Sequence, residues 1–195
     1  MEIITSCIQG NNAQLINEVY KLYIKDDDII CDITFGKGAF WKGLNKRVFG
    51  SDIRGKCEIL ADFKNLPYKS GVVDVVVFDP PYMHGGKTVK KSINSCYHNE
   101  NTSHESVIRN YCYGILESER ILKKHGRIMV KCQDEIESGK QRLSHVELIQ
   151  LLEILGFKII DLFVLMQDHT PTMRENYQKT ARKNHSYLII GELRC

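Results

Sequence analysis

Residues 72–82 read VVDVVVFDPPY, and this stretch decides how the rest of the chain can be arranged. The run from Val72 to Phe78 is apolar apart from one aspartate, as in a central strand of a parallel sheet that helices cover on both faces. Because proline lacks an N–H and keeps the preceding residue out of the helical region, Asp79 and Pro80 should leave the sheet in a rigid, extended conformation. Ligands of open α/β sheets bind beyond the carboxyl ends of the strands, so the sequence predicts a functional site at residues 79–82.

Asp79, Pro80, Pro81 and Tyr82 suit one kind of chemistry. The exocyclic amine of a nucleobase is a poor nucleophile because its lone pair is delocalised into the ring. The Asp79 carboxylate and the Pro80 carbonyl can accept hydrogen bonds from such an amine, and the Tyr82 ring offers a surface for an unstacked base. The alternative is a strand-ending turn with a helix-capping aspartate. Asp-Pro-Pro-Tyr resembles the catalytic motif of the S-adenosylmethionine-dependent amino-methyltransferases, which methylate adenine N6, cytosine N4 or guanine N2.

A glycine turn precedes this motif by one strand unit. Residues 29–33 predict a short strand, and residues 34–41 predict a turn that leads into a helix. Gly36 and Gly38 allow positive φ and let a ligand approach the backbone. Trp41 stands where a dinucleotide site has its third glycine, and no Gly-Lys-Ser/Thr follows, so dinucleotide and P-loop sites are both weakened. The turn resembles the cofactor motif of the methyltransferases, with Asp32, Phe35, Gly36 and Gly38 as the matching residues.

The resemblance implies further contacts with the cofactor, S-adenosyl-L-methionine. The predicted strand 47–51 ends at Asp52, where a carboxylate can accept hydrogen bonds from a ribose diol, although a solvated turn aspartate is the simpler interpretation. Asp62 matches the family's aspartate that contacts the adenine amino group, and Phe63 matches the apolar neighbour that packs on the ring. The implied cofactor-binding residues are therefore Asp32, Phe35, Gly36, Gly38, Asp52, Asp62 and Phe63.

Two long polar connections are predicted to face the substrate. From residue 83 to residue 101 the sequence shows no clear helical or strand periodicity. The connection 83–103 combines two glycines with lysines and aromatic residues, which suits a lid that contacts phosphates. Residues 166–185 join two predicted strands and carry a second basic run. A basic run is usually a solvated face, so phosphate binding and simple solvation both stay open. The predicted nucleic-acid-binding residues are Lys87, Lys90, Lys91, Arg174, Arg182 and Lys183.

Composition excludes several other classes of protein. The 195 residues are 43% hydrophobic and 26% charged, as in an ordinary globular protein, and a formal charge of +3 is weak support for nucleic acid by itself. No apolar run is long enough to span a membrane, and the first residues lack the features of a signal peptide, so a cytoplasmic protein without a membrane partner is expected. Seven scattered cysteines form no C-x-x-C motif, which argues against zinc and against a disulfide framework.

Alternating strands and helices predict an α/β fold. We expect helices over residues 12–23, over the segment that opens at 102–105 and ends near Lys124, and over 144–155, with capping boxes at 102–105 and 144–147. The predicted architecture is a class I methyltransferase (Rossmann-like) domain over residues 1–195. Its sheet would be mostly parallel and seven-stranded, with a C-terminal antiparallel hairpin and helices on both faces.

The sequence favours a nucleic-acid amino-methyltransferase that uses S-adenosyl-L-methionine and needs no metal. By the resemblance, aspartate at the first motif position favours adenine N6 over cytosine N4 as the target, and DNA is the favoured substrate. The alternatives are an RNA guanine-N2 or adenine-N6 methyltransferase, a DNA cytosine-N4 methyltransferase, and a nucleotide-binding module with an inert motif. A dehydrogenase is disfavoured because the third glycine is missing.

Overall fold

An eight-stranded sheet forms the centre of the protein in this computed structural model, which describes residues 3–55, 57–82, 103–168 and 180–194. The strand order from edge to edge is β1-β9-β10-β6-β5-β2-β3-β4. Neighbouring strands are parallel, except that β10 is antiparallel to both β6 and β9. The strands of this sheet are β1 (Cys7–Gln9), β2 (Ile30–Asp32), β3 (Val48–Asp52), β4 (Ile59–Leu60), β5 (Val73–Phe78), β6 (Leu122–Cys132), β9 (Phe157–Met166) and β10 (His185–Leu193).

This sheet confirms the predicted architecture and corrects two of its details. The mostly parallel order and the final antiparallel pair of β9 and β10 agree with the prediction. There are eight strands rather than seven, because Cys7–Gln9 adds to the sheet edge by pairing with β9. The structure also contains a separate two-stranded ribbon of β7 (Glu135–Glu137) and β8 (Lys140–Arg142), which the predicted single sheet did not include.

The central strand β5 is buried on both faces. Val75, Val76, Val77 and Phe78 are each at most 1% exposed, as the apolar run predicts for a strand covered by helices. Phe78 lies directly against Gly114 of helix α3, where an added Cβ would come within 2.2 Å of the ring. This close approach holds the end of β5, and therefore the residue that follows it, against the helix layer.

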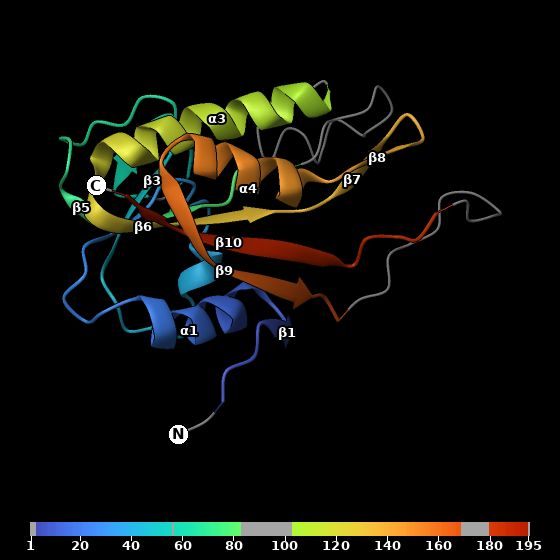
Figure 1. Cartoon of the computed structure of the whole chain (residues 1–195). Helices are drawn as coiled ribbons and strands as arrows, with labels where there is room; N and C mark the ends of the chain where they lie inside the picture. The colour runs from blue at the N-terminus through green and yellow to red at the C-terminus, as the bar shows by residue number, and fades with distance from the viewer. Residues whose placement is uncertain (1–2, 56, 83–102, 169–179, 195) are drawn as a thin grey trace.

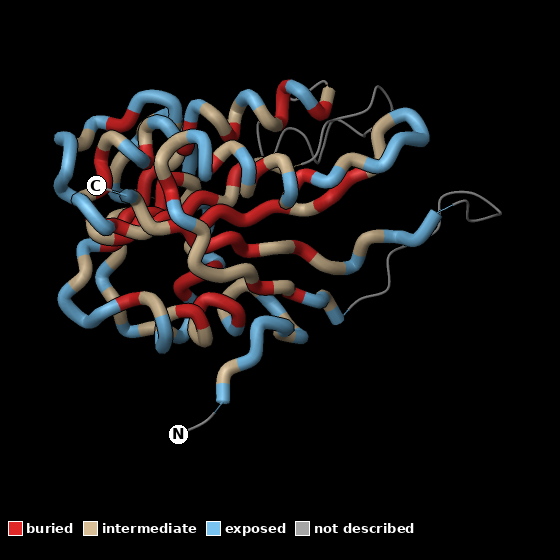
Figure 2. The backbone as a smooth tube through the Cα atoms, in the orientation of Figure 1, coloured by how far each residue is buried: buried red, intermediate tan, exposed pale blue. Residues whose placement is uncertain are grey.

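Helices cover both faces of the sheet (Figure 1). Helix α1 (Asn12–Tyr23) lies on one face, and α3 (His104–Ile121) and α4 (Ser144–Ile154) lie on the other. Asn11 is the N-cap of α1, because its side chain accepts hydrogen bonds from two backbone N–H groups of the first turn. Buried residues concentrate on the strands and on the inner sides of the helices (Figure 2).

Three local predictions differ from the structure. The glycine turn leads only into a single 3-10 turn, η1 (Ala39–Trp41), instead of a longer helix. The capping box of α3 is formed by Ser103 with Ser106 rather than by residues 102–105. Leu143 precedes α4 without a side-chain cap, because Ser144 is already the first helical residue and is buried. In the part of the chain that the structure describes, every helix is too short or too polar to cross a membrane.

Candidate active site

The candidate site lies where β2 and β5 end side by side. Here the strand order reverses, since the chain proceeds from β2 toward one edge of the sheet and from β5 toward the other. Such a switch point is the usual ligand-binding position in open α/β sheets. Ile33 donates a backbone hydrogen bond to Val77 (3.0 Å), and the Asp79 N–H donates to Thr34 Oγ1 (2.7 Å). These bonds fix the start of Asp-Pro-Pro-Tyr against the start of the glycine turn.

Asp79 carries a buried carboxylate oxygen. Its Oδ1 has no hydrogen-bond partner among the described residues, although buried polar atoms are almost always paired. Burial raises the pKa of the Asp79 carboxyl, and the positive charge of Lys131 acts in the opposite direction. The predicted catalytic aspartate therefore carries a buried carboxylate oxygen that has no hydrogen-bond donor among the described residues.

The rest of the motif packs around this carboxyl group. Pro80 is buried, and Pro81 and Tyr82 are half-buried. The Tyr82 ring packs against the apolar core beneath α3 and α4, and the Lys131 Nζ lies 5.3 Å from the ring centroid. The sequence analysis did not select Lys131. The sequence feature that could have indicated Lys131 is a lysine at the end of an apolar strand, because a charged side chain is seldom buried there without a partner.

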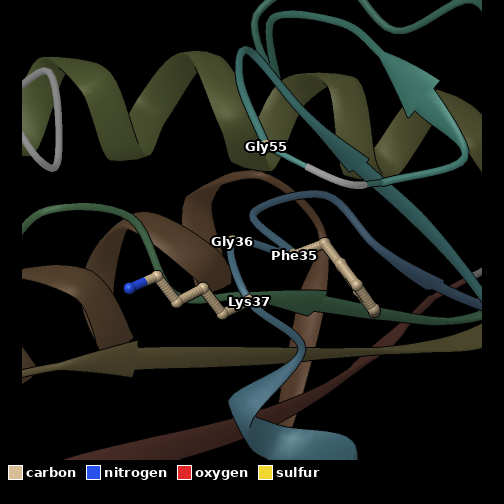
Figure 3. Close-up of a pocket in the computed structure, with 4 residues that line it drawn as sticks. All are labelled: Phe35, Gly36, Lys37 and Gly55. Carbon is tan, nitrogen blue, oxygen red and sulfur yellow. The ribbon is translucent and has the colours of Figure 1, made fainter.

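The glycine turn has the backbone that the sequence predicted. Gly36 and Gly38 have φ values of 54° and 64°, in the left-handed region that favours glycine. The Phe35 ring lies over the turn so closely that a Cβ at Gly38 would come within 2.9 Å of it. Beside the turn is a cavity of about 380 Å³, lined by Phe35, Gly36, Lys37 and Gly55 (Figure 3). Phe35 and Lys37 extend in opposite directions from the turn in this view.

Asp32 stabilises the turn from within. It is 2% exposed, accepts a hydrogen bond from Trp41 Nε1 at Oδ2 (2.8 Å), and accepts another from the Thr34 N–H at Oδ1 (3.0 Å). Burial raises the pKa of Asp32 to about 7; the two hydrogen bonds oppose this effect, and the charges of Asp79 and Asp52 add to it. Asp32 is therefore placed as an internal anchor of the turn, and Trp41 is the partner that the sequence analysis had noted only as a missing glycine.

Asp52, Asp62 and Phe63 lie at the same edge of the sheet, after β3 and β4. Asp52 Oδ2 accepts a hydrogen bond from the Gly36 N–H (2.9 Å), which ties the end of β3 to the turn. The Asp62 side chain is exposed and accepts from the Lys64 N–H (2.9 Å). The Phe63 ring packs on Phe78 at a centroid distance of 5.1 Å. The structure thus brings the predicted cofactor residues to one edge around the turn.

The predicted nucleic-acid contacts are only partly described. Lys87, Lys90, Lys91 and Arg174 lie outside the described residues. Arg182 is exposed and Lys183 is half-buried, on the segment that enters β10. Because β10 is antiparallel to β6, this segment lies at the carboxyl edge of the parallel strands, on the side of Asp79.

A buried histidine fixes the first turn of α3. His104 Nδ1 lies 3.0 Å from Glu135 Oε1, and His104 Nε2 lies 2.9 Å from Glu147 Oε1. These contacts join α3 to the β7–β8 ribbon and to α4. The His104 side chain is 2% exposed, so its ring lies inside the protein. Within the described ranges, no group of three or more His, Cys, Asp or Glu side chains is arranged to hold a metal ion.

Comparison with known proteins places the fold. No protein-family model and no curated protein matches the chain. A solved structure of a proposed methyltransferase of Bacillus halodurans aligns with a TM-score of 0.60 at 13% identity, over 95% of this chain and 99% of that one. A SAM-dependent methyltransferase of Methanosarcina mazei aligns with a TM-score of 0.55 at 15% identity, over 90% and 97%. The protein has the class I methyltransferase fold.

A third comparison covers less of the chain. A proposed DNA modification methylase of Thermus thermophilus aligns with a TM-score of 0.45 at 16% identity, over 66% of this chain and 49% of that one. The present chain therefore spans about half the length of that protein.

Proposed function

We propose that this protein is an S-adenosyl-L-methionine-dependent nucleic-acid amino-methyltransferase that acts preferentially on adenine N6 of DNA. The observation that carries the proposal is Asp79 Oδ1, a buried acceptor without a hydrogen-bond partner in the described residues, at the switch point of a methyltransferase fold. Such an atom becomes satisfied when a donor binds. The exocyclic amine of a base offers two N–H donors, which suit Asp79 together with the Pro80 carbonyl.

The glycine turn fits S-adenosyl-L-methionine as the cofactor. Its cavity of about 380 Å³ lies within the size range of small-molecule sites. The Gly36 N–H, from a residue that lines the cavity, donates to Asp52, and a carboxylate oxygen can accept a second bond, so Asp52 would offer an acceptor to a ribose hydroxyl. Asp62 and Phe63 would meet the adenine end. When bound, the cofactor supplies a methyl group on a positively charged sulfur.

The residues of this chain would act mainly by positioning. Asp79 and the Pro80 carbonyl would hold the amine by its hydrogens, and Tyr82 would support the base, which turns a bimolecular encounter into a prearranged one. Burial raises the pKa of Asp79, and this makes its carboxylate a better acceptor for the proton that the methylated amine loses late in the reaction. The sheet itself orients Asp79, through the bond from its N–H to Thr34.

The test is methyl transfer from labelled cofactor to DNA and to total RNA in parallel, followed by nucleoside digestion and chromatography. Label in N6-methyladenine of DNA supports the proposal. Label in an RNA guanine or adenine, or in a DNA cytosine, assigns the same site to another base or nucleic acid. Asp79→Asn is the matched control, since it keeps the shape and replaces an acceptor oxygen by a donor group. Cofactor binding without label in either nucleic acid would refute the proposal.

A further inference from the structure

The most unusual side chain near the site is Lys131, at the carboxyl end of β6. It is 2% exposed, although lysine is almost never fully buried unless it is paired. Its backbone carbonyl accepts a hydrogen bond from the hydroxyl of Tyr111 (2.6 Å), a buried residue of α3. Burying an ammonium group is unfavourable because the charge loses its hydration, so a nearby acceptor or π surface is expected for Lys131.

Two members of the Asp-Pro-Pro-Tyr motif, Asp79 and Tyr82, lie beside Lys131. Val130 of β6 pairs in register with Phe78 of β5, so Lys131 and Asp79 are the next residues along two neighbouring parallel strands. The positive charge of Lys131 acts directly on the Asp79 carboxyl. The Lys131 Nζ also lies 5.3 Å from the centroid of the Tyr82 ring, within cation–π distance.

The other titratable groups around Asp79 are neutral or acidic. These groups are Asp32 of β2, Tyr111 of α3 and Cys132 of β6, and the charge of Asp79 raises the pKa of each of them. None of these groups favours an ionised Asp79. Within the described residues, Lys131 is therefore the cation that opposes the effect of burial.

We propose that Lys131 is a positioning residue of the methyl-transfer site, which keeps Asp79 ionised as an acceptor and holds the Tyr82 ring against β6. The inference rests on the proposed function. A protonated Asp79 would present an O–H donor toward the amine hydrogens, whereas the carboxylate is an acceptor at both oxygens. The single buried charge of Lys131 thus acts on both the acceptor, Asp79, and the ring that supports the base, Tyr82.

The first test compares Lys131→Met with Lys123→Met. Lys123 lies near the opposite end of the same strand, and its Nζ contacts both oxygens of Asp74 at 2.9 and 2.8 Å, which makes it a matched control. Lys131→Met should move the acidic limb of the kcat/KM profile for methyl transfer to higher pH, with about a tenfold loss below the limb for each pH unit of the move. Lys123→Met should leave the limb in place, and Lys131→Arg should restore it. An unchanged limb in a folded Lys131→Met protein would overturn the inference.

A second test needs no substrate and therefore separates the two proposals. The carboxyl carbon of Asp79, assigned by its loss in Asp79→Asn, is titrated by NMR in the wild-type protein and in Lys131→Met. A higher midpoint in Lys131→Met supports the coupling even if the wild-type protein methylates neither DNA nor RNA, a result that would refute the proposed function alone. If Lys131→Met does not fold, the Lys131 ammonium signal is compared between wild type and Asp79→Asn. A shift supports the inference, and identical signals overturn it.

Discussion

Trp41→Phe tests whether Asp32 is the internal anchor of the glycine turn. The substitution removes the indole N–H that donates to Asp32 Oδ2 at 2.8 Å, while an aromatic ring remains in the same buried position. A buried acceptor left without its partner costs about 1 to 3 kcal/mol. For a chain of this size, each kcal/mol of lost stability lowers the melting temperature by about 2 to 4 °C, so we expect Trp41→Phe to lower the melting temperature by roughly 2 to 12 °C.

The size of this loss should depend on pH. Burial raises the pKa of Asp32 to about 7 from 3.8, so the folded protein binds more protons than the unfolded chain between these values, and stability falls as the pH rises through that window. A shift of this size corresponds to about 4 kcal/mol. The Trp41 bond reduces this penalty because it stabilises the ionised form. Trp41→Phe should therefore cost more above pH 7, where Asp32 is ionised, than below it.

Urea unfolding at about pH 5.5 and about pH 8 measures both effects. The set is wild type, Trp41→Phe, Asp32→Asn and the double variant, because a double-mutant cycle isolates the coupling between the two side chains. We expect a coupling above about 1 kcal/mol at the higher pH and a smaller one at the lower pH. An equal cost of Trp41→Phe at both pH values, or additive single variants at the higher pH, would refute the anchoring role of Asp32.

Three further predictions concern the turn, the cofactor and the substrate. Gly38→Ala should lower the free energy of unfolding by more than about 1 to 2 kcal/mol, the cost of a positive φ alone, because the new Cβ meets the Phe35 ring at 2.9 Å. Gly43→Ala is the control for the φ cost, since Gly43 has a φ of 86° and an added Cβ meets nothing within 4 Å. S-adenosyl-L-methionine at about a hundredfold excess over Kd should stabilise the protein by roughly 2.7 kcal/mol in a thermal melt, and a shift with a nicotinamide nucleotide instead would contradict the cofactor assignment. Methyl transfer should fall steeply with added salt if cationic side chains of the two long connections neutralise phosphates, and a flat salt dependence would argue against a nucleic-acid substrate.

The fold was predictable because its signals are local and periodic. The short β-branched apolar run at residues 73–78 indicates a buried strand, and the one-sided apolar pattern of residues 12–23 indicates a helix with one face against the core. The missed strand Cys7–Gln9 carries no such signal. It is short, largely exposed and held by pairing with β9, a contact that joins positions more than 150 residues apart. Edge pairing of this kind depends on the finished sheet rather than on the segment itself.

The candidate site was predictable in its membership, but only partly in its roles. Motif spacing brought Asp32, Asp52 and Asp79 to one edge, because parallel strands end at the same side of the sheet. Their hydrogen-bond partners depend on tertiary packing, so the bond between Trp41 and Asp32 could not be derived from spacing. The burial of Lys131 also depends on tertiary packing and could not be derived from the sequence, since a lysine at a strand end is solvated in most proteins.

Hydrogen bonds between strand ends connect the parts of the candidate site. Thr34 Oγ1 accepts from the Asp79 N–H, which ties the end of β5 to the turn after β2, and Asp52 accepts from the Gly36 N–H, which ties the end of β3 to the same turn. The proposed acceptor for the target amine, Asp79, and the proposed ribose acceptor, Asp52, are thus joined to one turn by bonds of 2.7 and 2.9 Å. Catalysis by positioning requires this kind of prearrangement, because misplacement by about 1 Å can cost on the order of a hundredfold in rate. Under the proposed function, the strand ends would therefore hold the reacting groups, and substrate selection would be assigned to residues outside the sheet.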